Sequence, residues 1–466
     1  MARTTIEITR EALVGLGVER LAAMLVEHAS ADGSLARKLQ LALAAGAGED
    51  SLIKPLARRI GELGRDDRFI GWNEASSFAR EIDQIRATVV DDLAPRAPRL
   101  GADLLADLVH TSGEVFERAD DSGGAIGDVY REMVEDWGRV WSRIPGRRPE
   151  ALAATVLREF RDDDYGVKGG IIAAFADALG ESGLEALRGL LEAEIEKLPV
   201  PQPKAEGGWG HERFALTRGL AEVADARHDV DGYVEAVSLG GDPERRAIEV
   251  ARRMLAAGRP DEALDWLDRA GGGRHGSGQA GDIDLRIEAL EALGRDAEAQ
   301  AARWDWFGRT LSLEHFRDYV ERIPAEERRR WTDRAVAAAE ERHQDVGSAL
   351  RFLTRIDETE AAERLVLTRA KEIDGHLYFV LRPVAEALAP AHPLGAVILY
   401  RAMASAVLGA ARSKSYGYAA RDLLQAGRLA GRVTDWNGLP DHEEFMRRLR
   451  QEHGRKYSFW PLLEGQ

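Results

Sequence analysis

Residues 251–267 read ARRMLAAGRPDEALDWL, and residues 286–300 read RIEALEALGRDAEAQ. The two stretches align at Gly258 and Gly294, which lie 36 residues apart, close to the period of about 34 residues that tetratricopeptide repeats have. In both stretches small alanines let two helices approach each other, a Gly-Arg turn closes the hairpin, and a Glu-Ala step opens the second helix. The stretches therefore predict a pair of helical hairpins.

The rest of the chain carries the same helical periodicity. Between Ile126 and Trp141, apolar residues recur at i, i+3, i+4, i+7 and i+8, as on one face of an α-helix. Looser copies of the hairpin pattern occur at 345–353, 357–367 and 392–403, whereas the alternation typical of strands is nearly absent. Short hairpins cannot each bury their own apolar face, so they must stack on their neighbours. We expect an all-α fold, an α-solenoid of helical hairpins that is tetratricopeptide-like in its C-terminal half.

A proline-rich segment divides the predicted helices into two regions. Residues 198–210 read LPVPQPKAEGGWG, and this run of prolines followed by Gly-Gly cannot continue a helix. We expect an N-terminal helical region at 1–198, a linker at 199–208, and a tetratricopeptide-like region at 209–466 that ends in a basic, aromatic capping helix. The apolar side of that cap is predicted to consist of Phe445, Leu449, Phe459, Trp460 and Leu463.

The composition excludes several kinds of protein. The 466 residues include no cysteine, which rules out disulfides, thiolate zinc sites, iron–sulfur clusters and a cysteine nucleophile. A net charge of −16 argues against broad attraction to nucleic acid or to anionic lipid. The beginning, MARTTIEITREAL, has no apolar signal region, and no apolar run is long enough to span a bilayer. We expect a cytoplasmic protein with no membrane partner.

Two acidic turns that contain glycine are candidates for metal or phosphate binding. The first, VFERADDSGGAIGDVY at 115–130, lacks the sixth-position Gly and twelfth-position Glu that a calcium loop starting at Asp120 needs, and no Lys follows its glycines. Asp120 and Asp121 suit a helix end, the two glycines at 123 and 124 suit a positive φ, and the next helix is expected to start near Ala125. The second turn, RDDDYGVKGG at 161–170, fails the same calcium test. We interpret both stretches as turns between helices.

No motif for catalysis is present. The sequence lacks HExxH, GxSxG, a P-loop, GxGxxG and a kinase signature, and no two of its eleven histidines lie three or four residues apart. Catalytic groups can still converge from distant positions. The sequence favours a protein without catalysis, cofactor or bound metal.

Clusters of aromatic and basic residues mark a candidate partner-binding surface. SKSYGYAARDLL at 413–424 would line a polar, aromatic groove or fill a repeat interface, and the basic tail RRLRQEHGRK at 447–456 would be a solvated helix face or a docking patch. The candidates are Tyr416, Tyr418, Arg421, Arg447, Arg450, His453, Arg455 and Lys456. In a third cluster, RWDWFGRT, Trp304 and Phe307 are expected in the core and Trp306 is expected to be partly exposed, rather than part of a stacking platform for bases.

Four segments resemble an uncharacterised bacterial family of helical-repeat proteins, namely residues 15–44, 68–95, 115–130 and 442–463. The last segment, HEEFMRRLRQEHGRKYSFWPLL, also looks like the tails of bacterial SWIM-type zinc-finger proteins, which carry comparable helical repeats. The resemblance implies a domain of unknown function, related to the helical C-terminal part of the SWIM proteins. It implies no zinc finger, because this chain lacks every cysteine of the SWIM motif.

These observations support three hypotheses for function. The first is a non-catalytic scaffold that binds an unknown protein or peptide partner on the concave surface of stacked hairpins, with the oligomeric state left open. The second is a nucleic-acid-associated protein, and the third is a divalent-metal enzyme that uses the acidic turns near residues 120 and 162. The second hypothesis needs a basic face, which would come from Arg412, Lys414, Arg421, Arg428, Arg432, Arg447, Arg448, Arg450, Arg455 and Lys456.

Overall fold

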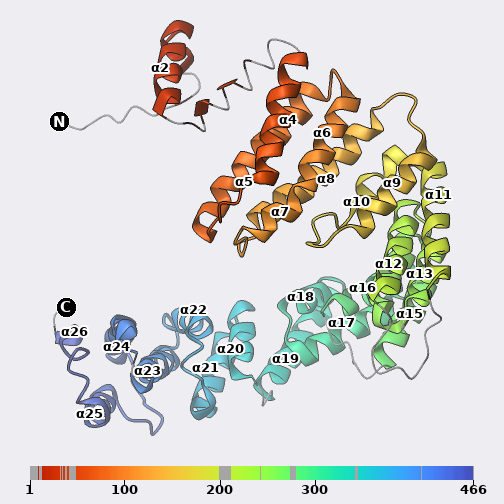
Figure 1. The fold of residues 1–466 in the computed structure, drawn as a ribbon. Helices are drawn as coiled ribbons and strands as arrows, with labels where there is room; N and C mark the ends of the chain where they lie inside the picture. The colour runs from red at the N-terminus through yellow and green to blue at the C-terminus, as the bar shows by residue number, and fades with distance from the viewer. Residues whose placement is uncertain are drawn as a thin grey trace. The chain divides into compact units, whose positions relative to one another are not determined.

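A computed structural model shows a chain built from helices (Figure 1). The structure describes residues 13–31, 49–198, 211–241, 243–272, 280–341, 345–410 and 412–464, together with a few single positions before residue 49. These ranges contain no strand, and their only extended pairing is an isolated parallel bridge between Ile70 and Ala119. No helix in them is long and apolar enough to cross a bilayer. The prediction of an all-α fold is confirmed.

The chain divides into two compact units, Met1–Ala257 and Gly258–Gln466. The first unit contains, in order, α2 (Val18–Ala31), α4 (Glu49–Arg65), α5 (Trp72–Ala87), the π-helical η1 (Thr88–Leu93), α6 (Pro98–His110), α7 (Ser112–Glu117), α8 (Ala125–Ser142), α9 (Pro149–Arg161), α10 (Ile171–Ala174), α11 (Ala176–Glu196), α12 (His211–Ala226), α13 (Val230–Leu239), the 3₁₀ turn η2 (Pro243–Arg246) and α14 (Ala247–Ala256).

The second unit is also helical throughout its described residues. It contains α15 (Pro260–Gly272), α16 (Ala280–Ala292), α17 (Asp296–Thr310), α18 (Leu313–Glu321), α19 (Ala325–Glu341), α20 (Val346–Arg355), α21 (Thr359–Thr368), the 3₁₀ turn η3 (Ala370–Glu372), α22 (Tyr378–Leu388), α23 (Pro393–Gly409), the 3₁₀ turn η4 (Ser413–Ser415), α24 (Tyr416–Ala430), α25 (His442–His453) and α26 (Pro461–Glu464).

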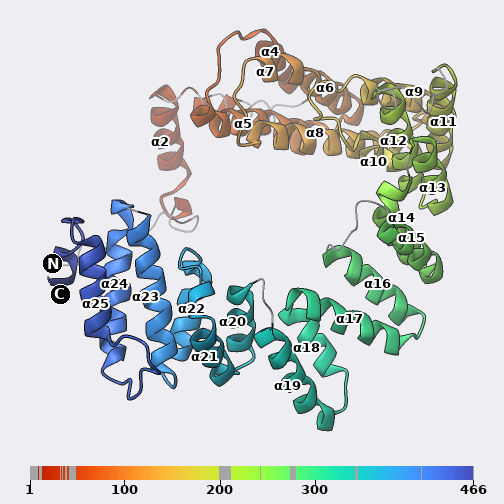
Figure 2. The ribbon, with the colours of Figure 1, turned by 90° about the horizontal axis from the view of Figure 1, so that it is seen from below.

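Helices within each unit pack mostly on helices that are near them in sequence. In the first unit α8 packs on α5, α6, α10 and α11, and α9 packs on α11. In the second unit α16 packs on α15 and α17, and α23 lies side by side with α24 (Figure 2). The predicted apolar stripe of α8 is the face that it buries, through Ile126, Tyr130, Met133, Trp137 and Val140. Amphipathic helices of this kind obtain most of their stability from such packing.

The two stretches that align in the sequence also match in local structure. Gly258 and Gly294 both adopt a left-handed backbone, with φ of +73° and +69°, a conformation that favours glycine because it has no Cβ. The arginine that follows each glycine binds the glutamate three residues further on, through Arg259–Glu262 and Arg295–Glu298 contacts of 2.6–2.7 Å. Helices α15 and α17 begin two residues after these glycines. The recurrence at a spacing of 36 residues is therefore structural as well as compositional.

The predicted linker at 199–208 lies outside the described residues. Helices α11 and α12, on either side of it, pack against each other within the first unit, and the chain divides into its two units after Ala257. A loop between stacked helices interrupts a helix as effectively as a domain linker does, so the domain boundary expected at this segment stays a prediction. The glycine-rich stretch at 271–282 also lies mostly outside the described residues.

The C-terminal end of the second unit closes over a core of its own. Leu449, Phe459 and Trp460 are buried there, and Phe445 and Leu463 pack against them from partly buried positions. All five belong to the predicted apolar side of the cap, which is confirmed. Turns at residues 454–460 separate α25 from α26, so the cap consists of two helices rather than one.

The aromatic cluster on α17 differs from its prediction at one residue. Phe307 is fully buried as expected, but Trp306 is only 7% exposed, whereas Trp304 is the partly buried ring and packs against Tyr319 and Trp331. Trp304 and Trp306 are two positions apart and point to different neighbours on a 3.6-residue period. The expected exposure of Trp306 is therefore wrong.

Candidate functional site

The structure places the predicted partner-binding residues of α24 in different environments. Tyr416 is 6% exposed and its ring meets Phe459 edge-on at 5.6 Å, so it belongs to the C-terminal core. Tyr418, two residues later, is 56% exposed, and the Arg421 guanidinium lies 4.7 Å from the centre of its ring. Tyr418 and Arg421 thus form an exposed aromatic–cation pair, while Tyr416 supports the fold beneath it.

The predicted residues of the tail lie on α25 and in the turn after it. The Arg450 guanidinium lies 5.0 Å from the centre of the Trp460 ring. Arg447 forms an ion pair with Glu444 of its own helix, and the side chain of His453 is 12% exposed. The turn itself holds the exposed Arg455 and the half-buried Lys456. A shared groove made by these residues and the α24 pair stays a prediction.

The first acidic turn, at 118–125, is a helix start. The carboxylate of Asp121 accepts the backbone N–H groups of Ile126 at 3.0 Å and of Gly127 at 2.8 Å, which are among the unpaired donors at the beginning of α8. Gly124 has a φ of +74°, and α8 starts at Ala125 as predicted. Gly123, which was expected to share this conformation, does not have a positive φ, because one left-handed residue suffices for the turn.

The second acidic turn, at 161–170, borders a pocket of about 550 Å³ in the first unit. The C-terminal end of α6, the start of α7 and the end of α9 form its walls together with the turn itself. The residues that line the pocket are predominantly acidic or polar, and they are His110, Ser112, Gly113, Glu114, Glu117, Arg158, Glu159, Asp162, Asp163, Asp164, Tyr165 and Lys168. Sequence reasoning identified this turn but did not identify the pocket.

A buried ion network lies at the base of the pocket. Glu159 and Lys168 are 3% and 4% exposed, and the Lys168 Nζ donates to Glu159 Oε2 at 2.9 Å and to the Asp162 carbonyl at 2.6 Å. His110 Nε2 lies 2.9 Å from the same Oε2 atom. Burial raises the pKa of Glu159, but the hydrogen bonds from His110 and Lys168 outweigh it and lower the pKa to about 2. Because Glu159 is ionised at neutral pH, Nε2 of His110 carries the hydrogen.

One sequence signal could have revealed this network. Glu159 lies three residues after Val156 and seven after Leu152, so it falls on the apolar stripe of α9, where Leu152 and Val156 are both buried. A carboxylate on an apolar stripe must be paired once the stripe packs, since an isolated buried charge is strongly unfavourable. The partner, Lys168, lies beyond the end of the helix, where no periodicity points to it.

The rim of the pocket carries carboxylates that lack a cationic partner. Glu114, Glu117 and Asp164 line the opening, and no described basic side chain forms an ion pair with any of them. Tyr165 is 46% exposed at the same rim, and its ring stacks on Phe116 with centres 5.3 Å apart. The pocket therefore combines a negative rim with an aromatic wall.

The residues that line the pocket offer mainly hydrogen-bond acceptors. Ser112 and His110 both line the pocket, yet no hydrogen bond joins them in the described residues, so the nucleophile–base pair of acyl transfer is not assembled. In the part of the chain that the structure describes, no group of three or more His, Asp or Glu side chains could hold a metal ion. What remains is a polar pocket that can accept hydrogen bonds from a cation.

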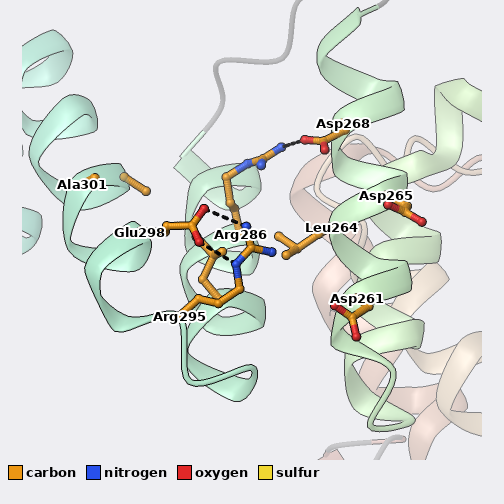
Figure 3. Close-up of a pocket in the computed structure, with 10 residues that line it drawn as sticks. Asp261, Leu264, Asp265, Asp268, Arg286, Arg295, Glu298 and Ala301 are labelled. Atoms are coloured by element: carbon orange, nitrogen blue, oxygen red, sulfur yellow. Dashed lines mark hydrogen bonds and ion pairs between the residues drawn. The ribbon is translucent and has the colours of Figure 1, made fainter.

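A second pocket, of about 410 Å³, lies in the second unit between α15, α16 and α17. Asp261, Asp265 and Asp268 of α15 line it, and Arg286 of α16 reaches across to Asp268 at 2.5 Å (Figure 3). On α17 Arg295 and Glu298 pair with each other (Figure 3). Neither Asp261 nor Asp265 forms an ion pair or hydrogen bond within the described ranges. This is an open groove rather than an enclosed cavity.

Comparisons with known proteins identify the family. No curated protein matches the sequence. Among solved structures, a "Circular tandem repeat protein with novel repeat topology and enhanced subunit contact surfaces" shares 14% identity over 92% of this chain and 97% of that chain, with a TM-score of 0.16, a value that supports no inference about shape or function. A model described as "Family of unknown function (DUF6880)" matches residues 1–462. The prediction of an uncharacterised family is thereby confirmed, and the chain belongs to this family of unknown function.

Proposed function

We propose that the chain is a non-catalytic helical-repeat scaffold that binds a segment of a partner protein. In this proposal its hairpins form an α-solenoid, tetratricopeptide-like in the C-terminal half, and it acts in the cytoplasm. The groove between α15, α16 and α17 is the observation that carries the proposal. It lies beside a turn that recurs at 36 residues, and helical repeats commonly bind extended segments in grooves between such hairpins.

The charges of the groove favour a partner segment that contains Lys or Arg. Asp261 and Asp265 are exposed and form no hydrogen bond or ion pair in the described ranges, although the charge of Asp261 also acts on Arg295. Arg286 and Arg295 are each paired with another carboxylate. The free charge of the groove is therefore negative, and the net charge of −16 would add long-range attraction to a basic partner. The exposed Tyr418 and Arg421 pair of α24, with the tail arginines, supports a second contact surface for the same function.

The decisive experiment is affinity purification of the tagged full chain from its native host, with mass spectrometry of the proteins that elute. Wild type is compared with a groove variant, Asp261→Lys with Asp265→Lys. The matched control is Glu288→Lys with Glu314→Lys, which changes exposed acidic residues of the same unit that do not line the groove. We expect one protein in stoichiometric amount with wild type and control, and its loss with the groove variant. Equal recovery with both variants, or no protein at all, would overturn the proposal.

The tail requires point substitutions rather than truncation. A chain that ends after Gly438 would lose Leu449, Phe459 and Trp460, which fill the C-terminal core, and would expose that core to solvent. Tyr418→Ala with Arg421→Ala removes only exposed side chains. If the partner contacts the exposed Tyr418 and Arg421 pair of α24, this double substitution weakens its recovery while the helices stay folded.

The nucleic-acid hypothesis receives less support from the C-terminal arginines. Arg447 and Arg448 both pair with Glu444, and Arg432 donates to the backbone carbonyls of Ala389 and Pro390. A gel shift at low salt tests it, and the absence of binding at micromolar protein would remove it. We also propose that the chain is of bacterial origin and is related to the helical part of SWIM-type proteins. This relation does not add a zinc site.

A further inference from the structure

The pocket beside the second acidic turn is built around a positive charge. Lys168 is 4% exposed, and its ammonium is held by a glutamate oxygen and a backbone carbonyl. The backbone N–H of Lys168 donates to Asp163 Oδ1 at 3.0 Å, which fixes the turn that delivers the lysine. The surroundings therefore stabilise one alkylammonium group away from water, because charged hydrogen bonds replace its hydration.

More negative charge surrounds the pocket than its own cations neutralise. Lys168 and Arg158 contact Glu159, while Glu114, Glu117 and Asp164 at the rim have no described ion-pair partner. Unpaired carboxylates gathered around one concavity repel each other, and a bound cation relieves that repulsion. This excess favours a ligand with more than one positive charge.

The hydroxyl of a largely buried serine provides an independent sign of a ligand. Ser112 is 7% exposed and lines the pocket, and its side chain makes no hydrogen bond to any described residue. The Ser112 oxygen is not among the buried atoms that lack a partner, so it stays accessible at the pocket wall and is a candidate contact for a ligand. A hydroxyl oxygen can accept a hydrogen bond from an ammonium group.

The rim adds a surface for the apolar part of such a ligand. The exposed Tyr165 ring is held parallel to Phe116, with an angle of 20° between the ring planes. A ring fixed in this way offers one face to a cation or to the methylene chain that carries it. Size is also suitable, since a volume of about 550 Å³ is within the range of small-molecule pockets.

We propose that this pocket binds an organic cation that carries alkylammonium groups, with Glu114, Glu117, Asp164 and Ser112 as its contacts. The cation is either a free polyamine or the lysine side chains of a peptide, which share this chemistry. The site lies in the first unit, apart from the α15–α17 groove, and does not depend on the proposed function.

Titration calorimetry on the full-length chain tests the proposal at about 0.15 M salt, where well-separated exposed charges are screened. The probes are spermidine, a hexalysine peptide and magnesium chloride. The site variant is Glu114→Gln with Asp164→Asn, and Ser112→Ala is a second, uncharged variant. The matched control, Asp91→Asn with Glu135→Gln, removes two exposed carboxylates of the same unit that do not line the pocket. Thermal unfolding checks that each variant is folded.

We expect saturable binding of spermidine or of the peptide to wild type and control, and about tenfold weaker binding to the site variant, since charged hydrogen bonds are lost. Spermidine binding without peptide binding identifies a free polyamine as the ligand, and the reverse identifies a protein segment. The Ser112→Ala variant should weaken the same probe to a smaller degree. The proposal is overturned if neither spermidine nor the peptide binds. It is also overturned if the control variant loses as much affinity as the site variant, or if magnesium binds as strongly as the organic probes.

Discussion

The two acidic turns of the first unit have similar composition and different physical roles. In the turn at 118–125, Asp121 directs both carboxylate oxygens to backbone N–H groups at the start of α8. In the turn at 161–170, Asp163 holds the turn, but Asp164 remains free beside a pocket that also contains a buried lysine. Acidic turn residues are therefore candidate ligand contacts only where the backbone does not already satisfy them.

The largest effect expected is that of removing the buried cation from the second turn. Lys168→Met leaves Glu159 ionised and buried without its ammonium partner, which should lower the free energy of unfolding by about 3–5 kcal/mol. Chemical denaturation measures this loss. The control near the first turn is Arg131→Met, whose ion pair with Asp128 is exposed and should contribute less than about 1 kcal/mol. Similar losses of unfolding free energy for Lys168→Met and Arg131→Met would contradict the difference between the two turns.

Acid should reveal the same network through Glu159. Its pKa of about 2 in the folded chain lies below the ordinary value of 4.5, so the unfolded chain binds more protons between these values. The stabilisation from Glu159 is therefore complete above about pH 4.5 and decreases as the pH falls towards 2. Unfolding free energies measured across this window should fall more steeply for wild type than for Glu159→Gln. If the unfolding free energies of wild type and Glu159→Gln depended on pH in the same way, the stabilisation would not come from the ionised Glu159.

The helix cap of the first turn should have an intermediate effect. Asp121→Ala leaves the N–H groups of Ile126 and Gly127 without an acceptor and should destabilise the chain by about 1–2 kcal/mol. Asp121→Asn keeps one acceptor oxygen and should cost less. Thermal or urea unfolding measures the loss of stability in the two variants. If only the negative charge of Asp121 mattered, both substitutions would cost the same.

A smaller effect is expected from the glycine that makes the first turn. Gly124→Ala places a Cβ on a residue with a φ of +74° and should cost about 1 kcal/mol, although nothing lies within 4 Å of the added atom. The adjacent Gly123→Ala meets open space without a positive φ and should change stability by less than about 0.5 kcal/mol. Equal losses would mean that the turn needs two flexible residues.

The smallest effect on stability should come from the carboxylates at the rim of the pocket. Glu114→Gln with Asp164→Asn breaks no described ion pair, so the free energy of unfolding should stay within about 0.5 kcal/mol of wild type. The same urea unfolding assay measures it. A clear loss of stability would mean that these carboxylates support the fold, as Asp121 does, rather than a ligand.

The helices could be predicted because their signals are local. The α8 stripe needs only a period of 3.6 residues, and the turns at Gly258 and Gly294 need only a residue that tolerates a positive φ. The side of α17 that is buried was harder to predict, since Trp304 and Trp306 have similar hydrophobicity and only the neighbouring helices decide between them.

The sites could be predicted only in part. The sequence identified the exposed Tyr418 and Arg421 pair, but it could not show that Tyr416 is buried under Phe459, because that contact joins segments far apart in the chain. The pocket depends on α6, α7 and α9 meeting around one lysine. Such convergence is a property of tertiary packing, and no spacing rule describes it.

Hydrogen exchange measured by mass spectrometry, with and without spermidine, tests the contrast between the two turns most directly. Binding in the pocket should slow exchange in peptides that cover residues 110–117 and 158–168 and leave residues 118–127 unchanged, because the first turn is already closed by Asp121. Equal protection of both turns, or protection of neither, would contradict the account.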